Sequence, residues 1–361
     1  MASNDRIKLL MVTECFGGGV LAYLTQLCNE LCDEFDVYLA YSTRAQTPEN
    51  YRDNLDNRIH LIYVEGFGDI SPVGVMRSVA KLRGIAEDVN PDIIHLHSSL
   101  AGVIGRIAFS KRKVPLVYTP HGYAFALLGS GLKSKLFYLV EKVLANRALT
   151  LNCCESEDEV ARTLGRNTAY IETGLNVDAL DKSLESIEAK EFDRFTVFSL
   201  GKAYVQKQPW LFNRIAELVP EADFIWIGGG ELEGQLTAPN VTCTGWLPRE
   251  KALSIAKGAN AFILCSKGEA ISMSLLEAMF LEKLILVSNV MGNNSVIEDG
   301  INGYVCDFAE EYALHILEAI KEYPFDLASK ARADIDSIYN TETMVERFSA
   351  FYEKQYREGI G

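Results

Sequence analysis

A regular alternation of short apolar runs and amphipathic stretches limits this 361-residue chain to one class of fold. Each apolar run has the length of a buried strand, and the stretch after it has the periodicity of a helix. Strands and helices that alternate in this way build parallel sheets, because a helical crossover joins each strand to the next. The pattern therefore predicts an α/β protein with doubly wound parallel sheets.

The alternation occurs twice along the chain, which predicts two domains. The first series has strands at 7–13, 37–41, 59–64, 93–97, 116–119 and 149–153, and helices at 20–33, 72–89, 100–110, 132–147 and 156–164. The second series has strands at 196–199, 224–227, 241–244, 261–265, 284–288 and 303–305. Two Rossmann-like domains that face each other across a cleft are the expected architecture, with ligands at the carboxyl ends of the strands.

The stretch between the two series is charged and irregular, as is typical of a linker. We therefore expect an N-terminal domain at 1–177, an interdomain linker at 178–194 and a C-terminal domain at 195–340. Residues 341–361 are expected to form a last amphipathic helix that packs back toward the N-terminal domain.

Composition excludes several classes of protein. A net charge of −14 argues against a general nucleic-acid binder. No run approaches the ~20 apolar residues of a membrane span, and the start of the chain lacks the pattern of a signal peptide. The eight cysteines are scattered without a paired C-x-x-C, which favours buried thiols over disulfides or a zinc site. We expect a cytoplasmic protein.

One basic block stands out on this acidic chain. Residues 101–150 hold eight basic side chains and one acidic side chain, Glu141, for a net charge of +7. The lysines and arginine that we assign to a membrane or acceptor side are Lys111, Arg112, Lys113, Lys133, Lys135 and Lys142. The last three lie on the predicted helix 132–147, whose apolar stripe we expect to pack on its sheet. A further interpretation is that its basic face contacts anionic lipid.

Two glutamates at a strand-to-helix junction suggest the ligand. Glu269 follows the predicted strand 261–265, and Glu277 lies about a turn and a half into the next helix. Ser272 is a plausible N-cap, and the amides of Met273 and Ser274 point out of the helix start, where phosphate binds well. Carboxylates suit hydroxyl groups. A ligand with hydroxyls at both ends and negative charge in the middle is a nucleotide-sugar.

A glycine cluster at residues 17–19 leads into the first helix and, with Ala22, matches G-x-G-x-x-A. Two observations oppose a dinucleotide site. Residues 14–16 separate the glycines from the predicted strand 7–13, and the second strand ends without the acid that holds a ribose. We favour a loop that lets Gly18 and Gly19 approach a phosphate, with a simple tight turn as the alternative.

Three histidines and two lysines complete the candidates. His121 follows the strand 116–119 and is interpreted as a ligand-contacting residue because of that position. His95 and His97 share one face of their strand, and without a third ligand they are expected to be core or hydrogen-bonded residues rather than metal ligands. Lys202 and Lys207 follow the first strand of the second series, where they can offset the charge of a diphosphate.

Taken in order, these stretches resemble the retaining glycosyltransferases of family GT4, which have the GT-B fold. The resemblance rests on motifs spread over nearly the whole chain: 17–20, 92–99, 101–102, 105–106, 119–122, 156–157, 201–207, 245–248, the E-x7-E pair and 298–303. The early motifs are similar to those of transferases in bacterial capsule, exopolysaccharide or O-antigen assembly. Many relatives have arginine where Lys202 stands, and Gly-Phe-Gly where this chain has 270–272.

The resemblance implies a role for each site residue. Glu277 would hold the ribose, Glu269 the hydroxyls of the donor sugar, and Lys207 with Lys202 the diphosphate. The amides of 272–274 and the glycines at 18–19 would also contact the phosphates, and His121 would face the donor sugar. Such enzymes use lysines and helix dipoles in place of a cation, so no metal and no cofactor are expected.

The resulting hypothesis is a metal-independent, retaining glycosyltransferase. It would transfer a sugar from a nucleotide diphosphate, expected to be UDP, to a lipid-linked glycan at the inner membrane face, as a peripheral membrane protein. The sequence leaves three alternatives open: transfer to a small soluble acceptor, a sugar-nucleotide epimerase of the same fold, and a non-catalytic accessory subunit.

Overall fold

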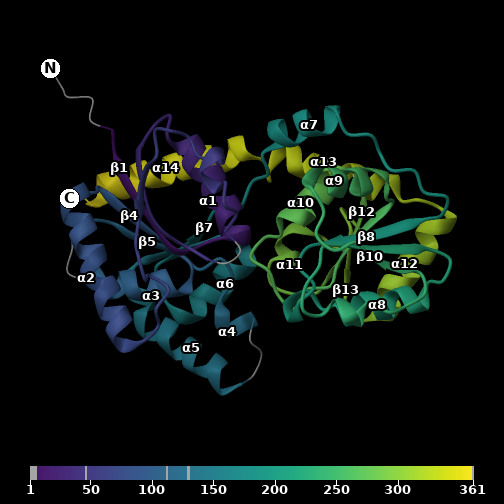
Figure 1. Cartoon of the computed structure of the whole chain (residues 1–361), viewed down its shortest axis with the longest axis horizontal. Coiled ribbons are helices and arrows are strands. Elements are labelled where there is room, and N and C mark those ends of the chain that lie inside the picture. Colours follow the sequence, from purple (N-terminus) through teal and green to yellow (C-terminus); the bar gives the residue numbers. More distant parts are fainter. Residues whose placement is uncertain (1–5, 45–46, 111–112, 128–130, 360–361) are drawn as a thin grey trace. The chain divides into compact units, whose positions relative to one another are not determined.

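The computed structural model describes residues 6–44, 47–110, 113–127 and 131–359 (Figure 1). The chain divides into two compact units. Unit 1 comprises Met1–Thr173 and Glu342–Gly361, and unit 2 comprises Gly174–Thr341. Each unit is built on one parallel sheet covered by helices, which confirms the predicted fold class of two doubly wound α/β domains.

Unit 1 contains a seven-stranded sheet with the order β3-β2-β1-β4-β5-β6-β7, in which every pair is parallel. The strands are β1 (Lys8–Phe16), β2 (Asp36–Thr43), β3 (His60–Tyr63), β4 (Ile93–His97), β5 (Leu116–Thr119), β6 (Leu149–Asn152) and β7 (Thr168–Tyr170). The helices are α1 (Gly18–Leu31), α2 (Pro72–Val89), α3 (Ser99–Ala108), α4 (Ala124–Leu127), α5 (Leu132–Leu144), α6 (Glu155–Leu164) and α14 (Thr341–Gly359), with short 3-10 turns at Tyr51–Asn54 and Ala145–Arg147. The short strand β7 was not predicted from the sequence.

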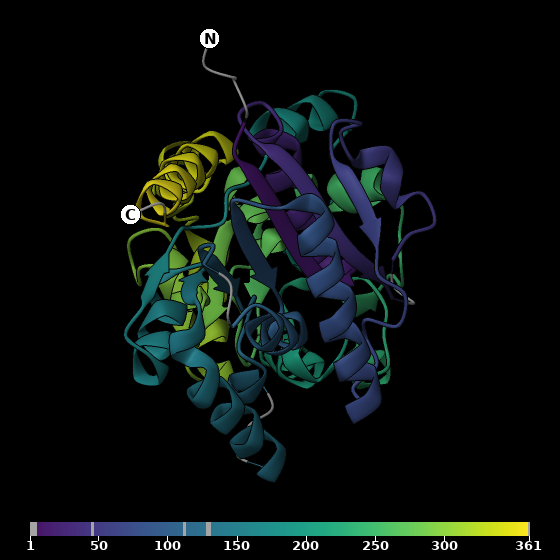
Figure 2. The same cartoon turned by 90° about the vertical axis from the view of Figure 1, so that its left-hand side faces the viewer.

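Side chains on the two faces of this sheet enter separate cores. Along β1, Leu9 and Met11 pack into one cluster, and Leu10 and Val12 pack into the other. This alternation is the period of two that a strand imposes. Helix α3 contacts both α2 and α5, so these three helices lie side by side in unit 1 (Figure 2).

The C-terminal helix α14 packs on unit 1, although it follows unit 2 in the sequence. Met344, Phe348 and Tyr352 are buried in the same cluster as Leu9 and Met11. Figure 1 shows this helix, in yellow, beside the purple strands of unit 1. Unit 1 is therefore completed by the last segment of the chain.

Unit 2 contains a six-stranded parallel sheet with the order β10-β9-β8-β11-β12-β13. The strands are β8 (Thr196–Leu200), β9 (Asp223–Ile227), β10 (Val241–Cys243), β11 (Ala261–Leu264), β12 (Leu284–Ser288) and β13 (Tyr304–Cys306). The helices are α7 (Val177–Glu185), α8 (Pro209–Leu218), α9 (Arg249–Gly258), α10 (Met273–Phe280), α11 (Asn293–Val296), α12 (Ala309–Lys321) and α13 (Phe325–Ser337), with 3-10 turns at Val205–Lys207 and Glu233–Gln235.

The predicted irregular linker at 178–194 is wrong in its first half. Residues Val177–Glu185 form helix α7, capped by the side chain of Asn176, which accepts from the amide of Ala179 at 2.9 Å. Leu180 and Leu184 are buried in the core of unit 2. The charged composition of this stretch reflects one solvent-facing side of an amphipathic helix, not an absence of structure.

In each sheet the chain order reverses at one point, which leaves a crevice at the carboxyl ends of the two adjacent strands. In unit 1 the reversal lies between β1 and β4, and in unit 2 it lies between β8 and β11. The loops after these strands carry most of the candidate site residues.

Candidate active site

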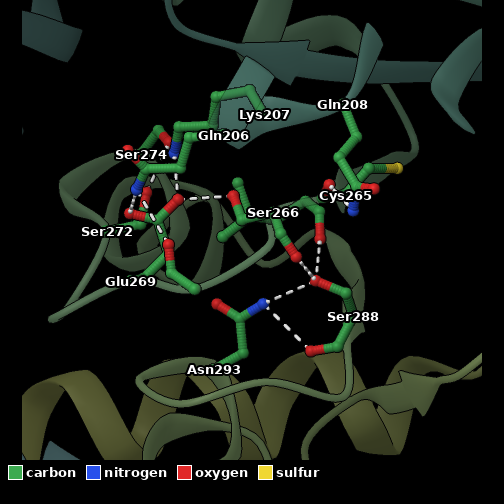
Figure 3. Close-up of polar contacts among 12 residues, drawn as sticks. Gln206, Lys207, Gln208, Cys265, Ser266, Glu269, Ser272, Ser274, Ser288 and Asn293 are labelled. Atoms are coloured by element: carbon green, nitrogen blue, oxygen red, sulfur yellow. Dashed lines mark hydrogen bonds and ion pairs between the residues drawn. The ribbon is translucent and has the colours of Figure 1, made fainter. Parts of the chain in front are cut away.

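The loop after β11 holds Glu269 in a buried cluster of polar side chains (Figure 3). Lys207 lies in the loop after β8, and its Nζ contacts Oε1 of Glu269 at 2.7 Å. The hydroxyl of Ser266 also donates to Oε1 of Glu269, whereas among the described residues Oε2 accepts a single long bond, from Gln206 Nε2 at 3.4 Å. The structure thus brings together Glu269 and Lys207 at the switch point of unit 2.

A second set of hydrogen bonds holds the backbone of the Glu269 loop in place. The amide of Glu269 donates to the carbonyl of Met291 at 3.0 Å. Ser288 Oγ donates to the carbonyl of Ser266 at 2.6 Å, and Asn293 Nδ2 donates to Ser288 at 3.0 Å (Figure 3). These residues come from the last position of the neighbouring strand β12 and from the loop and helix after it, so the carboxyl end of that strand positions the whole cluster.

Glycine is required at position 292 for this arrangement. Its φ is +85°, and a Cβ there would lie 2.4 Å from the carbonyl oxygen of Ala270. Any other residue would be strained and would push the Glu269 loop aside. Gly292 and Asn293 were missed from the sequence, where their only signal was an unexplained glycine after a strand.

Glu277 lies on the first turns of α10 and is nearly buried. Arg249, the first residue of α9, approaches it with 2.6 Å between Nη2 and Oε1. Half of the Arg249 side chain remains exposed. Arg249 was not predicted, because an arginine at a helix start looks like an ordinary surface residue.

The start of α10 offers backbone amides. Ser272 occupies the N-cap position as predicted, but its side chain does not cap the helix; its hydroxyl contacts that of Ser274 at 2.9 Å. The amides of Met273 and Ser274 have no partner among the described residues. A helix start of this kind attracts negative charge.

Lys202 is not part of the Lys207–Glu269 cluster. Its Nζ contacts Oε1 of Glu231 at 2.6 Å, at the end of the glycine loop that follows β9. That loop lies against residues 201–203, since a Cβ on Gly228 would lie 2.3 Å from the carbonyl oxygen of Gly201. The two predicted phosphate-binding lysines are therefore held by different carboxylates.

In unit 1, both ring nitrogens of His121 are engaged. Nε2 lies 3.1 Å from Nδ1 of His97, and Nδ1 lies 3.5 Å from the Cys153 sulfur. The backbone of His121 is left-handed, with a φ of +55°. Burial of the ring lowers the pKa of His121 to about 3, so it is neutral at pH 7.

The carboxylate of Glu157 stabilises the strained His121 loop. It accepts from the amide of Gly122 at 2.7 Å and from the amide of Cys153 at 2.8 Å. Burial raises the pKa of Glu157 to about 7, and the two amide bonds oppose that shift. Glu157 therefore ties the loop after β5 to the loop after β6.

His95 is a hydrogen-bonded core residue, as predicted. The Thr119 hydroxyl donates its proton to the carbonyl of Leu151 at 2.6 Å, so it accepts from Nε2–H of His95 at 2.8 Å. Nδ1 of His95 then accepts from the Tyr352 hydroxyl at 2.6 Å. His97 is also buried, and its Nε2 has no partner among the described residues. Burial lowers the pKa of both rings.

The glycine cluster begins α1 directly. Strand β1 continues to Phe16, with an irregularity between Thr13 and Phe16, so the predicted gap of three residues before the glycines is wrong. Gly18 has a φ of +57°, and nothing lies within 4 Å of a Cβ added at Gly18 or Gly19. Open space beside these glycines is compatible with either a close ligand or a plain turn.

Helix α5 does not pack its apolar stripe on the sheet, contrary to our expectation. Leu132, Leu136, Leu139 and Val143 are 57–85% exposed and recur at the spacing of one helix face. The buried side chains of this helix are Glu141, which pairs with Arg106 of α3 at 2.8 Å, and Leu144 at its last position. We call these four apolar residues the α5 stripe.

The basic residues assigned to a membrane side are only partly placed. Lys133, Lys135 and Lys142 lie on α5 and are exposed or half-exposed, and Lys113 is exposed before β5. Lys111 and Arg112 lie outside the described residues. In the described part of the chain, no helix is both long and apolar enough to cross a membrane.

The cysteines and histidines of the described residues give no metal site. All eight cysteines are free thiols, and six of them are buried, as the scattered pattern predicts. No group of three or more potential metal-binding side chains occurs in the ranges that the structure describes.

Comparisons with known proteins define the family to which this chain belongs. Residues 18–168 match the family described as a glycosyl transferase 4-like domain, and residues 194–322 match glycosyl transferases group 1. The chain belongs to the glycosyltransferases, and its two parallel-sheet domains are those of the GT-B fold.

Particular relatives are similar at moderate identity. The chain is 27% identical over 285 residues to the UDP-Gal:alpha-D-GlcNAc-diphosphoundecaprenol alpha-1,3-galactosyltransferase of Escherichia coli, covering 71% of this chain and 73% of that protein. It is 24% identical over 260 residues to the putative glycosyltransferase EpsD of Bacillus subtilis, covering 64% of this chain and 68% of that protein.

Solved structures share the fold. Sucrose-phosphate synthase from Thermosynechococcus elongatus superposes with a TM-score of 0.81 at 15% identity, covering 98% of this chain and 100% of that chain. The HepE protein of Anabaena, in complex with UDP and glucose, gives a TM-score of 0.77 at 19% identity, covering 97% and 100%. At these identities the likeness extends to the fold alone.

Proposed function

We propose that this glycosyltransferase transfers a sugar from UDP-sugar to a lipid-linked glycan in surface polysaccharide synthesis, with retention of configuration and without a metal. The observation that carries the proposal is the Lys207–Glu269 pair at the switch point of unit 2. The pair combines a cation for phosphate with a carboxylate for sugar hydroxyls, at the sheet edge where ligands of such folds bind.

We propose that donor binding replaces ion pairs within the site by contacts to the donor. In the structure, Lys207 is paired with Glu269, and Glu277 is paired with Arg249. We propose that the diphosphate takes Lys207 and the first-turn amides of α10, which releases Glu269 to accept from hydroxyls of the donor sugar. Glu277 would accept from the ribose. The phosphate would replace the carboxylate as the anion paired with the lysine.

The same groups would serve the transfer step. As the acceptor oxygen bonds to the anomeric carbon, the bond from that carbon to the diphosphate oxygen breaks. The acceptor proton passes to the leaving phosphate, so no separate base is required. Lys207 and the α10 amides would stabilise the charge that grows on the diphosphate, a role that a divalent cation fills in other enzymes. Full activity in excess EDTA is the expected result.

Activity with defined substrates tests the proposal. Lys207→Ala and Glu277→Ala are expected to abolish most transfer from UDP-sugar to a lipid-linked acceptor, whereas Lys354→Ala, at an exposed site on α14, is expected to act as wild type. Full activity of both site variants would refute the assignment. The anomeric configuration of the product, read by NMR, tests retention. An epimer formed without acceptor would show the alternative enzyme, and an absence of any turnover would favour an accessory subunit.

The role of His121 remains a proposal that rests on the resemblance. Its nitrogens are held by His97 and Cys153, so a hydrogen bond from the ring to a ligand requires one of these contacts to break. His121→Ala is expected to lower kcat while the affinity of unit 2 for UDP is unchanged. A variant with unchanged kcat would remove His121 from the reaction.

A lipid-linked acceptor is favoured by the α5 stripe. Its exposed apolar face is accompanied by Lys133, Lys135 and Lys142, a combination that suits the interface of an anionic membrane. The printed name of the Escherichia coli relative includes a diphosphoundecaprenol acceptor. We therefore propose a cytoplasmic enzyme that binds the inner membrane face peripherally.

Liposome flotation separates this acceptor from a small soluble one. The wild type is expected to float with vesicles that contain phosphatidylglycerol and not with neutral vesicles. Leu136→Asp with Leu139→Asp is expected to abolish flotation, while Leu314→Asp, at a leucine of α12 with 53% exposure, is expected to leave it unchanged. Wild-type protein that never floats would refute membrane binding and favour a soluble acceptor.

A further inference from the structure

Unit 1 buries the carboxylate of Glu157, in the first turn of α6, next to a second buried acid that it does not resemble. Asp158 pairs with Arg162 at 2.7 Å, whereas Glu157, among the described residues, accepts from two backbone amides and forms no ion pair. The raised pKa of Glu157 means that the cost of its burial exceeds the gain from the two amides. Stability alone therefore does not account for this carboxylate, and the groups that it holds decide its meaning.

Those groups are the two loops that enclose His121. Oε1 of Glu157 accepts from the amide of Gly122 at 2.7 Å, and Oε2 accepts from the amide of Cys153 at 2.8 Å. His121 and Gly122 are consecutive residues with positive φ, +55° and +93°. A residue other than glycine keeps such a backbone only where its surroundings fix it. The Glu157 carboxylate is a contact that fixes it.

The ring of His121 is enclosed by side chains from three elements of unit 1. Its Nδ1 lies 3.5 Å from the sulfur of Cys153, and its Nε2 lies 3.1 Å from Nδ1 of His97. The ring of Tyr23, from α1, packs edge-on against it with 4.6 Å between ring centres. The orientation of the His121 ring thus depends on the backbone at 121–122 and at 153, and both segments are held by Glu157.

We propose that Glu157 is a positioning residue for His121 in the transfer step. One carboxylate oxygen holds the turn that carries the ring, and the other holds the loop that places the Cys153 sulfur against it. This inference rests on the proposed function, because it assumes that His121 takes part in the transfer. Displacing a reacting group by about 1 Å can lower a rate on the order of one-hundredfold, so loss of the carboxylate should lower kcat by roughly ten- to one-hundredfold. The KM for the donor should change little, because the donor is held by unit 2.

A double-mutant cycle on kcat tests whether Glu157 acts through His121. Glu157→Gln keeps the shape of the side chain but directs an NH₂ group at one of the two amides, so kcat should fall by roughly ten- to one-hundredfold. In the His121→Ala background the same change should lower kcat less than about twofold, because no ring is left to position. Asp158→Asn, at the next residue of α6, is the matched control and should lower stability with kcat unchanged.

A second variant loosens the same turn and leaves the carboxylate in place. Gly122→Ala puts a side chain at a φ of +93°, where L-residues are strained, and should also lower kcat only when His121 is present. This variant keeps the inference testable if glutamine is not tolerated at position 157.

NMR of protein with labelled histidines provides a readout that does not depend on activity. The His121 signal is the one that disappears in His121→Ala. In the wild type, burial lowers the pKa of His121 to about 3, so this signal should not titrate between pH 8 and 5. In Glu157→Gln the released ring should titrate near its ordinary pKa of about 6.5.

The outcomes separate this inference from the proposed function. Equal losses of kcat for Glu157→Gln with and without His121, or a His121 ring that still does not titrate in that variant, would overturn the positioning role and leave the proposed function standing. A wild type that transfers no sugar from any UDP-sugar would overturn the proposed function, and the positioning role would fail with it.

Discussion

Units 1 and 2 share a doubly wound sheet, and each places a carboxylate at its switch point, but the two carboxylates are used differently. Glu14, near the carboxyl end of β1, is 4% exposed and accepts from the Ser98 hydroxyl, the amide of Ala101 and Arg44. Glu269, after β11, has Lys207 and the Ser266 hydroxyl on one oxygen and, in the part of the chain that the structure describes, a single long bond on the other. A carboxylate bound to a helix amide is part of the fold, whereas one bound to a lysine side chain can exchange its partner.

The largest expected difference between the units is catalytic. Lys207→Ala should lower kcat/KM by about 100- to 1000-fold, because it removes a cation from the charge that develops on the diphosphate. Its unfolding free energy should fall as well, because the two side chains are only 13% and 10% exposed and Glu269 loses its cation while it retains Ser266. Steady-state kinetics and urea unfolding measure both values. A loss of stability without a loss of rate would make this pair structural, like its counterpart in unit 1.

The counterpart should respond in the opposite sense. Glu14→Ala leaves the amide of Ala101 and the Ser98 hydroxyl without their acceptor, which should lower the unfolding free energy by about 2–3 kcal/mol. Donor affinity, measured by UDP binding to unit 2, should remain that of the wild type. A stable variant with weakened UDP binding would contradict the division of roles.

The next largest expected difference is the sensitivity of each unit's stability to acid. His95, His97 and His121 of unit 1 have lowered pKa values in the fold, so the unfolded state takes up protons as the pH falls through about 6.5, and stability is lost. Glu157, with its raised pKa, acts in the other direction, since the folded state takes up its proton near pH 7. Between pH 7 and 5.5 the net loss should be roughly 2 kcal/mol.

Hydrogen exchange at the two pH values, corrected for intrinsic rates, resolves that loss by unit. Unit 1 should lose protection, while unit 2, whose histidine His315 lies near the surface, should keep it. Glu157→Gln should steepen the acid loss, because it removes the one proton uptake that favours the fold. Equal acid sensitivity of both units would contradict the prediction.

The smallest expected effect concerns Arg249. Its ion pair with Glu277 is half-exposed, and such pairs contribute at most about 1 kcal/mol. Arg249→Ala should therefore raise the KM for UDP-sugar up to about fivefold with kcat unchanged, since binding is affected equally in the ground and transition states. Arg214→Ala, at an exposed arginine on α8, provides the matched control. A fall in kcat instead would place Arg249 in the transfer step.

The fold could be predicted from the sequence because the strands of a parallel sheet are buried on both faces and therefore have continuous apolar sequences. Prediction from apolar runs missed elements that are short or that expose one side to solvent. β7 has three half-buried residues, and α7 shows a charged side to solvent. The prediction for helix α5 failed for the opposite reason: an apolar stripe predicts burial, but here the stripe is exposed, and the buried side chains are Glu141, paired with Arg106, and Leu144.

The candidate site was only partly visible in the sequence. Glu269 and Lys207 were recognised as site residues from their motifs, and the structure places them in contact. Their actual partners were not foreseeable, because contacts such as Ser288 to Ser266 and Arg249 to Glu277 join segments whose distance in space depends on the sheet order. Residues close in sequence can also have distant partners: Lys202 pairs with Glu231, whereas Lys207, five residues later, pairs with Glu269.

The return of the last helix to unit 1 makes unit 2 an insertion within another domain. The two segments that cross between the units are paired with each other, through Leu175 to Tyr339 at 2.7 Å and Thr341 to Leu175 at 3.0 Å. The ends of 174–341 therefore meet, and a fragment with these ends contains the whole of unit 2. A chain truncated before α14, by contrast, exposes the face that Phe348 covers and leaves His95 without the Tyr352 hydroxyl, so unit 1 needs a segment that follows unit 2 in the sequence to complete its core.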